Sequence, residues 1–270
     1  MRTPPPESNW WQVSLDYPDP ASAEHAAAHH LAPALDGRDW FFIRKGAWRC
    51  RIRIPHDATE RTETQAQLTA HLDRLVTAGH LNGWVRGVYE PETRAFGGPA
   101  AMDAAHRLWC ADTRHFMLFL GTDSEEADGR RELAVLLSRT LMRAAGLDQY
   151  EQGDVWNRMA AIRPLPAGTP TPTVFYRQVH RLLRVDPGPE AAHFTTGAFA
   201  QHVAWARAFQ TCGRTLASLA ADGRLERGLR GVVAHHVLFT WNRLGIPAPV
   251  QAGLAHTAAT VTFDPETVGL

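Results

Sequence analysis

The sequence feature that most constrains the fold is the alternation of arginine with apolar residues over residues 49–54. On an extended strand, Arg49, Arg51 and Arg53 project to one face of a sheet, and the apolar residues between them project to the other face. Three neighbouring guanidinium groups repel one another, so their face must meet water or an electron-rich partner such as a carboxylate, a phosphate or peptide carbonyls. The pattern therefore predicts a strand with one basic face, which is either a solvated surface or a binding surface.

Large aromatic side chains flank this strand, at Trp40, Phe41, Phe42 and Trp48. They place flat apolar surface beside the cations, as binding clefts commonly do. We therefore favour a binding cleft over a solvated outer face.

The composition excludes several classes of protein. Of the 270 residues, 44% are hydrophobic and 21% are charged, which is ordinary for a globular domain. Lys+Arg and Asp+Glu both number 28, so no net charge attracts nucleic acid or an anionic membrane. No stretch approaches the roughly 20 apolar residues of a membrane span, and the N-terminus lacks the apolar core of a signal peptide. We expect a cytoplasmic protein without nucleic-acid or membrane partners.

The sequence contains no recognisable metal or cofactor motif. Cys50, Cys110 and Cys212 are widely spaced, which excludes a disulfide framework and a CxxC-type metal site. The fourteen histidines include no HExxH or similar spaced set, and no GxGxxG, GxxxxGK[ST] or GxSxG motif is present. We expect neither a metal nor an organic cofactor.

The order of the predicted elements indicates an α+β fold, with a mixed, largely antiparallel sheet, packed helices and a helical C-terminal part. Strands are predicted at residues 10–15, 40–54 and 84–89, and helices at residues 21–35, 63–78, 100–112, 125–145, 173–185, 197–222, 224–244 and 250–260. Residues 1–9 are expected to be a flexible tail. Four prolines within residues 164–173 predict an internal boundary between an α+β part, 10–163, and a helical part, 174–262, which packs on it within one integrated domain.

Polar side chains gather near the end of the helix predicted at residues 224–244. His236, Thr240 and Arg243 lie along one side at i, i+4 and i+7, and Asn242 follows alongside. Such a cluster is either a buried network that ties helices together or a site that handles protons. Both interpretations stay open at this point.

Five stretches of sequence are similar to motifs of a known family: Trp40–Arg44 with the arginine strand, Tyr89–Gly98, Met102–His106, Phe175–Leu183 and His236–Gly245. Together, and in this order, they resemble the thiopeptide-type bacteriocin biosynthesis family. The resemblance implies the fold of the elimination domain of lantibiotic dehydratases. It also implies a precursor peptide, leader plus modified core, as the partner, and we consider other maturation enzymes as further partners.

The resemblance implies one of two chemistries. One removes glutamate from glutamylated Ser or Thr; the other joins two dehydroalanines in a formal [4+2] cycloaddition that builds the central pyridine of a thiopeptide. Eliminating members typically carry an arginine before the aromatic-Gly-Gly sequence and a histidine four residues before the Asn-Arg pair. Ala95 and Leu238 stand at those places here, with Arg94 one step before Ala95. Elimination needs a base and a cation for the departing carboxylate, so these departures favour the pyridine-forming reaction.

The expected activity is therefore that of a pyridine synthase, which cyclises a linear azole-containing peptide with loss of water and of the leader. Glutamate elimination and a non-catalytic leader-binding module are the alternatives. From residue chemistry and the resemblance together, the predicted catalytic residues are Tyr89, His236, Thr240 and Arg51. The predicted substrate-binding residues are Arg53, Arg49, Trp48, Trp205, Trp241, Asn242 and Arg243.

Overall fold

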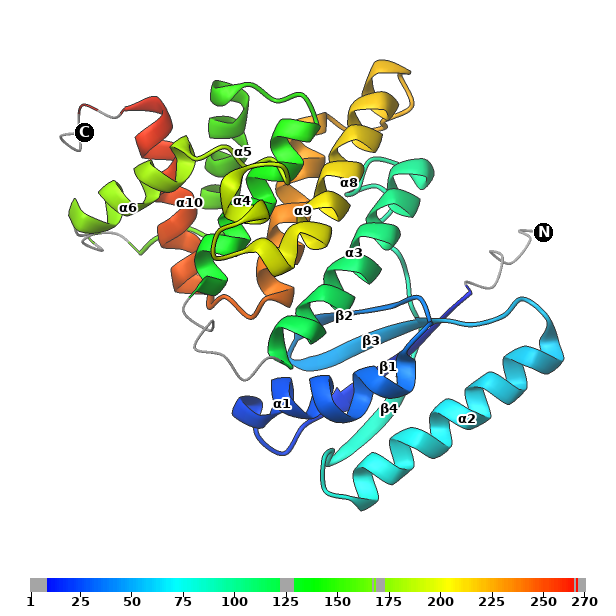
Figure 1. The fold of residues 1–270 in the computed structure, drawn as a ribbon. Helices are drawn as coiled ribbons and strands as arrows, with labels where there is room; N and C mark the ends of the chain where they lie inside the picture. The colour runs from blue at the N-terminus through cyan, green and yellow to red at the C-terminus, as the bar shows by residue number, and fades with distance from the viewer. Residues whose placement is uncertain (1–8, 122–128, 167, 169–172, 265, 267–270) are drawn as a thin grey trace. The chain divides into compact units, whose positions relative to one another are not determined.

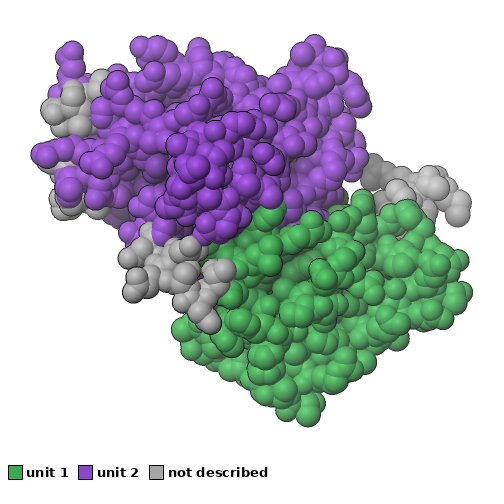
Figure 2. Space-filling view, in the orientation of Figure 1, with its two compact units in different colours: residues 1–91, 112–124 green, residues 92–111, 125–270 purple. Residues whose placement is uncertain are grey.

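The computed structural model describes residues 9–121, 129–166, 168, 173–264 and 266. The expected tail at residues 1–9 lies outside the described residues except for Asn9. The chain divides into two compact units (Figure 2), the first formed by residues 1–91 and 112–124 and the second by residues 92–111 and 125–270. The proline-rich segment 164–173 falls within the second unit, so this division differs from the predicted boundary. The integration of residues 10–163 and 174–262 into one domain stays a prediction.

The first unit contains a four-stranded sheet with the strand order β2-β3-β1-β4 (Figure 1). The strands are β1 (Trp10–Asp16), β2 (Trp40–Lys45), β3 (Ala47–Arg53) and β4 (Gly83–Gly87). All three pairings are antiparallel, which confirms the α+β class. Gly46 joins β2 to β3 at φ 70°, a left-handed conformation that glycine adopts without strain.

The register of β3 confirms the predicted alternation. Arg49, Arg51 and Arg53 pair with Ser14, Gln12 and Trp10 of β1, while Cys50 and Ile52 on the other face are fully buried. We call the first of these faces the arginine face, formed by Trp10, Gln12, Ser14, Phe41, Ile43, Arg49, Arg51 and Arg53. Because antiparallel partners project to the same side, residues distant in sequence share this face.

Two helical segments cover the opposite face of the sheet. The first comprises α1 (Pro20–Ala26), a π turn, η1 (Ala27–Leu31), and a 3-10 turn, η2 (Ala32–Leu35); the second is α2 (Ala58–Thr77). Arg44 of β2 forms an ion pair with Glu24 of α1, with N–O 2.6 Å. Trp84 of β4 donates Nε1–H to Asp73 of α2. These contacts place both segments on the side of Cys50, as Figure 1 shows them, away from the arginine face.

The segment predicted as one helix at residues 21–35 contains three successive helix types: α, π and 3-10. Asp19 caps its start by accepting a hydrogen bond from the Ala21 N–H. Pro33 has no N–H to donate to the preceding turn, and the backbone tightens into the 3-10 segment around it.

Helices α4 to α10 lie in the second unit, and α3 is shared between the two units. Their bounds are α3 (Pro99–Leu120), α4 (Arg130–Ala144), α5 (Gln149–Ile162), α6 (Thr173–Arg184), α7 (Ala192–Thr195), α8 (Val203–Ala221), α9 (Leu229–Arg243) and α10 (Ala248–Phe263). Helix α3 is continuous where a break after residue 112 was expected, and it contributes residues to both units. Helix α5 was not predicted. The predicted helical C-terminal part is confirmed, and none of the described helices has the length and apolar character needed to span a bilayer.

Candidate active site

Arg51 lies at the centre of a polar and aromatic cluster on the arginine face. The residue is 7% exposed, and its Nε–H donates to Gln12 Oε1 over 2.8 Å. Its guanidinium carbon lies 4.4 Å from the centre of the Tyr89 ring and 5.4 Å from that of Phe41. Aromatic faces attract a cation, and the attraction grows when both are removed from water. The first unit thus brings together two of the predicted catalytic residues, Arg51 and Tyr89.

Gln12 fixes the direction of this cluster. Its Nε2 donates to the Val88 carbonyl over 3.0 Å, which leaves Oε1 to accept from Arg51. Gly87 gives the amide room, because a Cβ at that position would lie 2.7 Å from Gln12 Nε2. Gln12 was not among the predicted site residues, since only the pairing of β1 with β3 places it opposite Arg51.

The other two arginines of this face have different surroundings. Arg53 is exposed, forms an ion pair with Asp39 at 3.1 Å and lies 5.4 Å from the Trp10 ring centre. Arg49 is half-buried. The three arginines of this face therefore differ in exposure to solvent, since Arg51 is buried, Arg49 is half-buried and Arg53 is exposed. Their predicted contacts with substrate stay predictions.

Trp48 lies on the opposite face of the sheet from Arg51. It stacks on Phe42, with ring centres 4.4 Å apart and planes 4° apart, and the Arg44 guanidinium lies 4.4 Å above it. The structure does not bring Trp48 to the arginine face, and its packing is that of a core residue. Its predicted role as a substrate wall stays untested.

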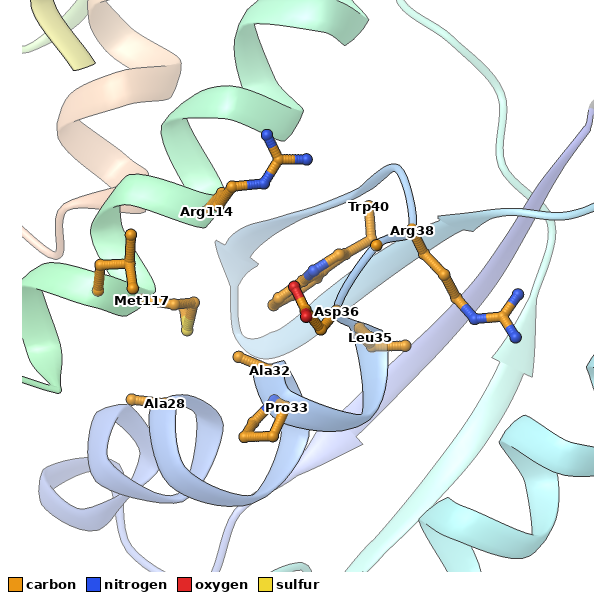
Figure 3. Close-up of a pocket in the computed structure, with 11 residues that line it drawn as sticks. Ala28, Ala32, Pro33, Leu35, Asp36, Arg38, Trp40, Arg114 and Met117 are labelled. Carbon is orange, nitrogen blue, oxygen red and sulfur yellow. The ribbon is translucent and has the colours of Figure 1, made fainter. Parts of the chain in front are cut away.

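A pocket of about 200 Å³ also belongs to the first unit (Figure 3). Ala28, Pro33 and Met117 give it apolar walls beside Trp40. Figure 3 shows the Arg38 side chain directed away from it. None of the predicted site residues lines this pocket, so it lies outside the predicted site.

In the second unit, His236 of α9 occupies a fully buried aromatic environment. Its ring centre lies 5.0 Å from that of Phe96 and 6.5 Å from that of Trp109. Neither ring nitrogen has a hydrogen-bond partner among the described residues. Burial, followed by the nearby His235 and Arg243, lowers the pKa of His236 to about 3. The imidazole is therefore neutral at pH 7, with one N–H donor and one acceptor nitrogen.

Thr240 and Arg243 continue the same buried stripe along α9. Both are fully buried, and the Thr240 Oγ1 also lacks a partner within the described chain. The Arg243 guanidinium carbon lies 6.0 Å from the Trp109 ring centre. Buried donors and acceptors are nearly always paired, and each unpaired one costs about 1–3 kcal/mol. A cluster that keeps such groups is therefore a candidate site for proton handling.

The loop that carries Phe96 is fastened to the segment before α9. Gly97 and Gly98 have φ 89° and 101°, and the Glu226 N–H donates to the Gly97 carbonyl over 2.9 Å. Arg227 Nη1 donates to the Ala95 carbonyl over 2.7 Å and lies 3.2 Å from His235 Nδ1. Burial, and then the charge of Arg227, lower the pKa of His235. Arg227 was missed in the sequence, where nothing indicates that it reaches this loop.

The remaining predicted residues of the second unit take part in packing. Trp241 Nε1 donates to Ser138 Oγ over 3.1 Å, and Asn242 Oδ1 accepts from Gln251 Nε2 over 2.9 Å. Trp205 of α8 is fully buried. These contacts support the interpretation as a buried structural network for Trp241 and Asn242, and their substrate contacts stay predictions.

Two observations concern possible metal ligands and thiols among the described residues. No group of three or more His, Cys, Asp or Glu side chains within them is arranged to hold a metal ion. Burial raises the pKa of both Cys50 and Cys212 to about 12, so neither thiol is ionised near pH 7.

The low pKa of His236 leads to a prediction about acid stability. An unfolded chain protonates this side chain near pH 6.5, whereas the folded chain protonates it only near pH 3, so stability falls as the pH decreases through that window. From about pH 7.5 to about pH 4.5 this group alone is expected to remove about 2–3 kcal/mol. Urea unfolding at both pH values should show a smaller loss in H236F than in the wild type. The control is H256Q, which removes an exposed histidine of the same unit and should lose as much unfolding free energy as the wild type. If H236F loses as much unfolding free energy as the wild type, the prediction is wrong.

The fold is shared with three solved structures. The tRNA-dependent lantibiotic dehydratase MibB from Microbispora sp. 107891 superposes with a TM-score of 0.69 at 18% identity, over 98% of this chain and 29% of that chain. TsrL superposes with a TM-score of 0.58 at 16% identity, over 96% of this chain and 94% of that one. TbtD, a pyridine synthase from thiomuracin biosynthesis, does so with a TM-score of 0.54 at 17% identity, over 96% and 99%. Identities this low show the fold alone.

The sequence comparisons identify the family. No curated protein matches the sequence. The family model described as lantibiotic biosynthesis dehydratase C-term matches residues 10–262, which is nearly the whole chain. The protein therefore belongs to the family of lantibiotic biosynthesis dehydratase C-terminal domains.

Proposed function

We propose that this protein is a pyridine synthase of thiopeptide maturation. In this reaction a linear azole-containing peptide brings two dehydroalanines together, with the amide before one of them in its iminol form. A formal [4+2] cycloaddition forms two bonds, and loss of water and of the leader peptide as an amide then gives the pyridine. Holding the two dehydroalanines in contact contributes up to roughly 7–11 kcal/mol in well-oriented cases.

The observation that carries the proposal is the state of His236. A buried imidazole with a pKa of about 3 is a weak base, poorly suited to removing a proton from carbon. The same neutral ring can accept a proton at one nitrogen and donate one from the other, which is what an amide needs to become an iminol. Thr240, one turn away, adds a hydroxyl that can relay a proton.

Access to His236 requires movement of a neighbour, because the residue is fully buried. Phe96 covers its ring and is followed by two glycines in left-handed conformations. Glycine can take up large backbone changes, so this loop is the element we expect to move when substrate binds.

Arg51 is proposed to bind carbonyl or carboxylate oxygens of the same peptide within the first unit. Gln12 and the Tyr89 ring hold its guanidinium in one orientation, which lowers the entropic cost of binding. The Tyr89 hydroxyl is the proposed proton donor beside it.

Glutamate elimination is the second candidate function, and one observation favours it. Arg227 and His235 place a cation and an imidazole 3.2 Å apart beside the Ala95 carbonyl, the position at which eliminating members carry their own arginine. Such a pair could bind a departing carboxylate and accept a proton.

Mass spectrometry of two parallel reactions tests these functions. The protein is incubated with a dehydrated, azole-bearing precursor in one tube and with a glutamylated precursor in the other. A macrocycle that has lost water and a leader amide is the expected product. Loss of glutamate in the second tube would establish elimination instead, and binding of leader without conversion in either tube would indicate a leader-binding module.

A further inference from the structure

A groove of about 660 Å³ opens in the second unit between α5, α6 and the end of α10. Its volume is in the range of ligand-binding clefts. None of the residues that line it, all within the described part of the chain, is an aspartate or glutamate. Arg139, His180 and Arg184 line it together with three aromatic side chains. The groove therefore combines cationic and aromatic surface without an acidic counterpart.

Two aromatic side chains of the groove are exposed and contact each other. Tyr150 is 68% exposed and Phe263 is 50% exposed, and their rings stack with centres 6.4 Å apart. Gly153 permits this arrangement, because a Cβ there would lie 2.7 Å from Phe263 Cζ. Below them Trp156 is buried and stacks on Trp241. We call Tyr150 and Phe263 the aromatic ledge. Exposed aromatic surface that gathers at one place is typical of an interaction site.

The two arginines of the groove have different surroundings, and neither forms an ion pair among the described residues. Arg139 donates Nη1–H to the Leu182 and Val185 carbonyls at the end of α6, and burial lowers its pKa only to about 10, so it is charged at pH 7. Arg184 is exposed and has no ion-pair partner among the described residues.

Several acidic side chains of this unit form contacts outside the groove, whereas Asp264, which follows Phe263 in the chain, is exposed. Asp148 and Glu151 bond to each other's backbone N–H in the capping box of α5. Asp186 is paired with Arg143, and Asp154 with Arg158 and Arg230. The charge of Asp186 also favours the charged form of Arg139, so Arg184 is the main uncompensated cation of the groove, beside its apolar ledge.

We infer that this groove docks an acidic segment of the precursor peptide, with carboxylates against Arg184 and Arg139 and an apolar side chain on the aromatic ledge. The identity of the peptide as a maturation substrate rests on the proposed function. An apolar ledge in the same groove as two arginines suits a peptide with both apolar and acidic side chains, and the ledge offers little to a phosphate ion. The groove lies apart from the buried His236 cluster, none of whose residues lines it, so it positions peptide rather than reacts with it.

Fluorescence anisotropy on the whole chain tests the docking. The probe is a labelled synthetic peptide of about 12 residues containing Glu, Asp, Leu and Phe, compared with the same peptide bearing Gln and Asn in place of the acids. The acidic probe should bind at least about tenfold more tightly, and added salt should reduce that advantage. Equal binding of the two probes would overturn the inference.

Substitutions locate the binding surface. Arg184→Ala should raise the Kd of the acidic probe about fivefold, and Phe263→Ala about tenfold. Arg181→Ala is the matched control, because Arg181 is an exposed arginine on the same helix that does not line the groove. Tyr150→Ala provides a second ledge variant should F263A fail to fold. If R181A weakens binding as much as R184A, the attraction is a general property of the surface and the groove is not the site.

Turnover of the full precursor separates this inference from the proposed function. R184A should raise KM while leaving kcat near the wild-type value, as expected for remote binding. If the wild type converts the precursor and the groove variants show an unchanged KM and Kd, the docking is wrong and the function stands. If the probe binds in the groove and no precursor is converted, the function is wrong and the docking stands.

Discussion

His236→Phe should strongly slow cyclisation while leaving the protein as stable as the wild type at pH 7, or more stable. The imidazole is fully buried against Phe96, and neither of its nitrogens has a partner within the described residues. A phenyl ring of similar shape removes an unpaired donor that costs about 1–3 kcal/mol, so the fold should not suffer. Loss of a group that transfers protons in the reaction should lower kcat by about 10²–10⁴-fold.

A stable but inactive variant is the outcome that separates a functional histidine from a structural one. Turnover by mass spectrometry and urea unfolding at pH 7 are measured on the same preparation. Thr257→Val is the matched control, because Thr257 of α10 is also fully buried with an unpartnered hydroxyl in the described chain, and it should retain activity. If H236F is active, His236 handles no proton; if H236F is inactive and also much less stable, the residue serves the core.

Arg51→Met should lower kcat/KM by about 10²-fold or more and also destabilise the first unit. The substitution removes the cation that stacks on Tyr89 and leaves Gln12 Oε1 without its donor. A buried acceptor left without a partner costs about 1–3 kcal/mol, and loss of a charge-assisted contact to substrate adds a loss of binding. Steady-state turnover and urea unfolding measure the two effects.

A double substitution separates these effects for Arg51. Gln12→Met in the R51M background removes the unpaired Oε1, but it also removes the donor of the Val88 carbonyl. The double variant should therefore recover only part of the stability and none of the activity. Arg86→Met is the control, because it removes an exposed arginine from the neighbouring strand β4. Recovery of activity in the double variant would mean that Arg51 supports the fold and does not bind substrate.

Several features of the fold were readable from local sequence. The alternation over residues 49–54 predicted β3 and its two faces, and the apolar spacing with Gly245 predicted the end of α9. Helix α5 was missed although Asp148 and Glu151 form a capping box, which is a recognisable start signal. The π and 3-10 turns within residues 27–35 were missed because periodicity does not distinguish them from a regular helix.

The candidate sites were readable only in part. Helical spacing predicted that His236, Thr240 and Arg243 share one side of α9, and all three are buried there. Aromatic rings were predicted beside the arginine strand, and Arg51 does contact two of them. These rings belong to Phe41 and Tyr89 rather than to Trp48. Adjacent residues of a strand project to opposite faces, so Trp48 cannot share a face with its neighbour Arg49.

The sequence by itself determined which residues alternate, which helical residues share a side, and the family, because these follow from local periodicity and from ordered motifs. Only the tertiary structure decided that Gln12, 39 residues from Arg51, orients its guanidinium, and that Arg227 reaches the Ala95 carbonyl. Both contacts depend on strand register and on how a loop packs against a helix. Those arrangements are set by the burial of the whole core, and no short stretch of sequence encodes them.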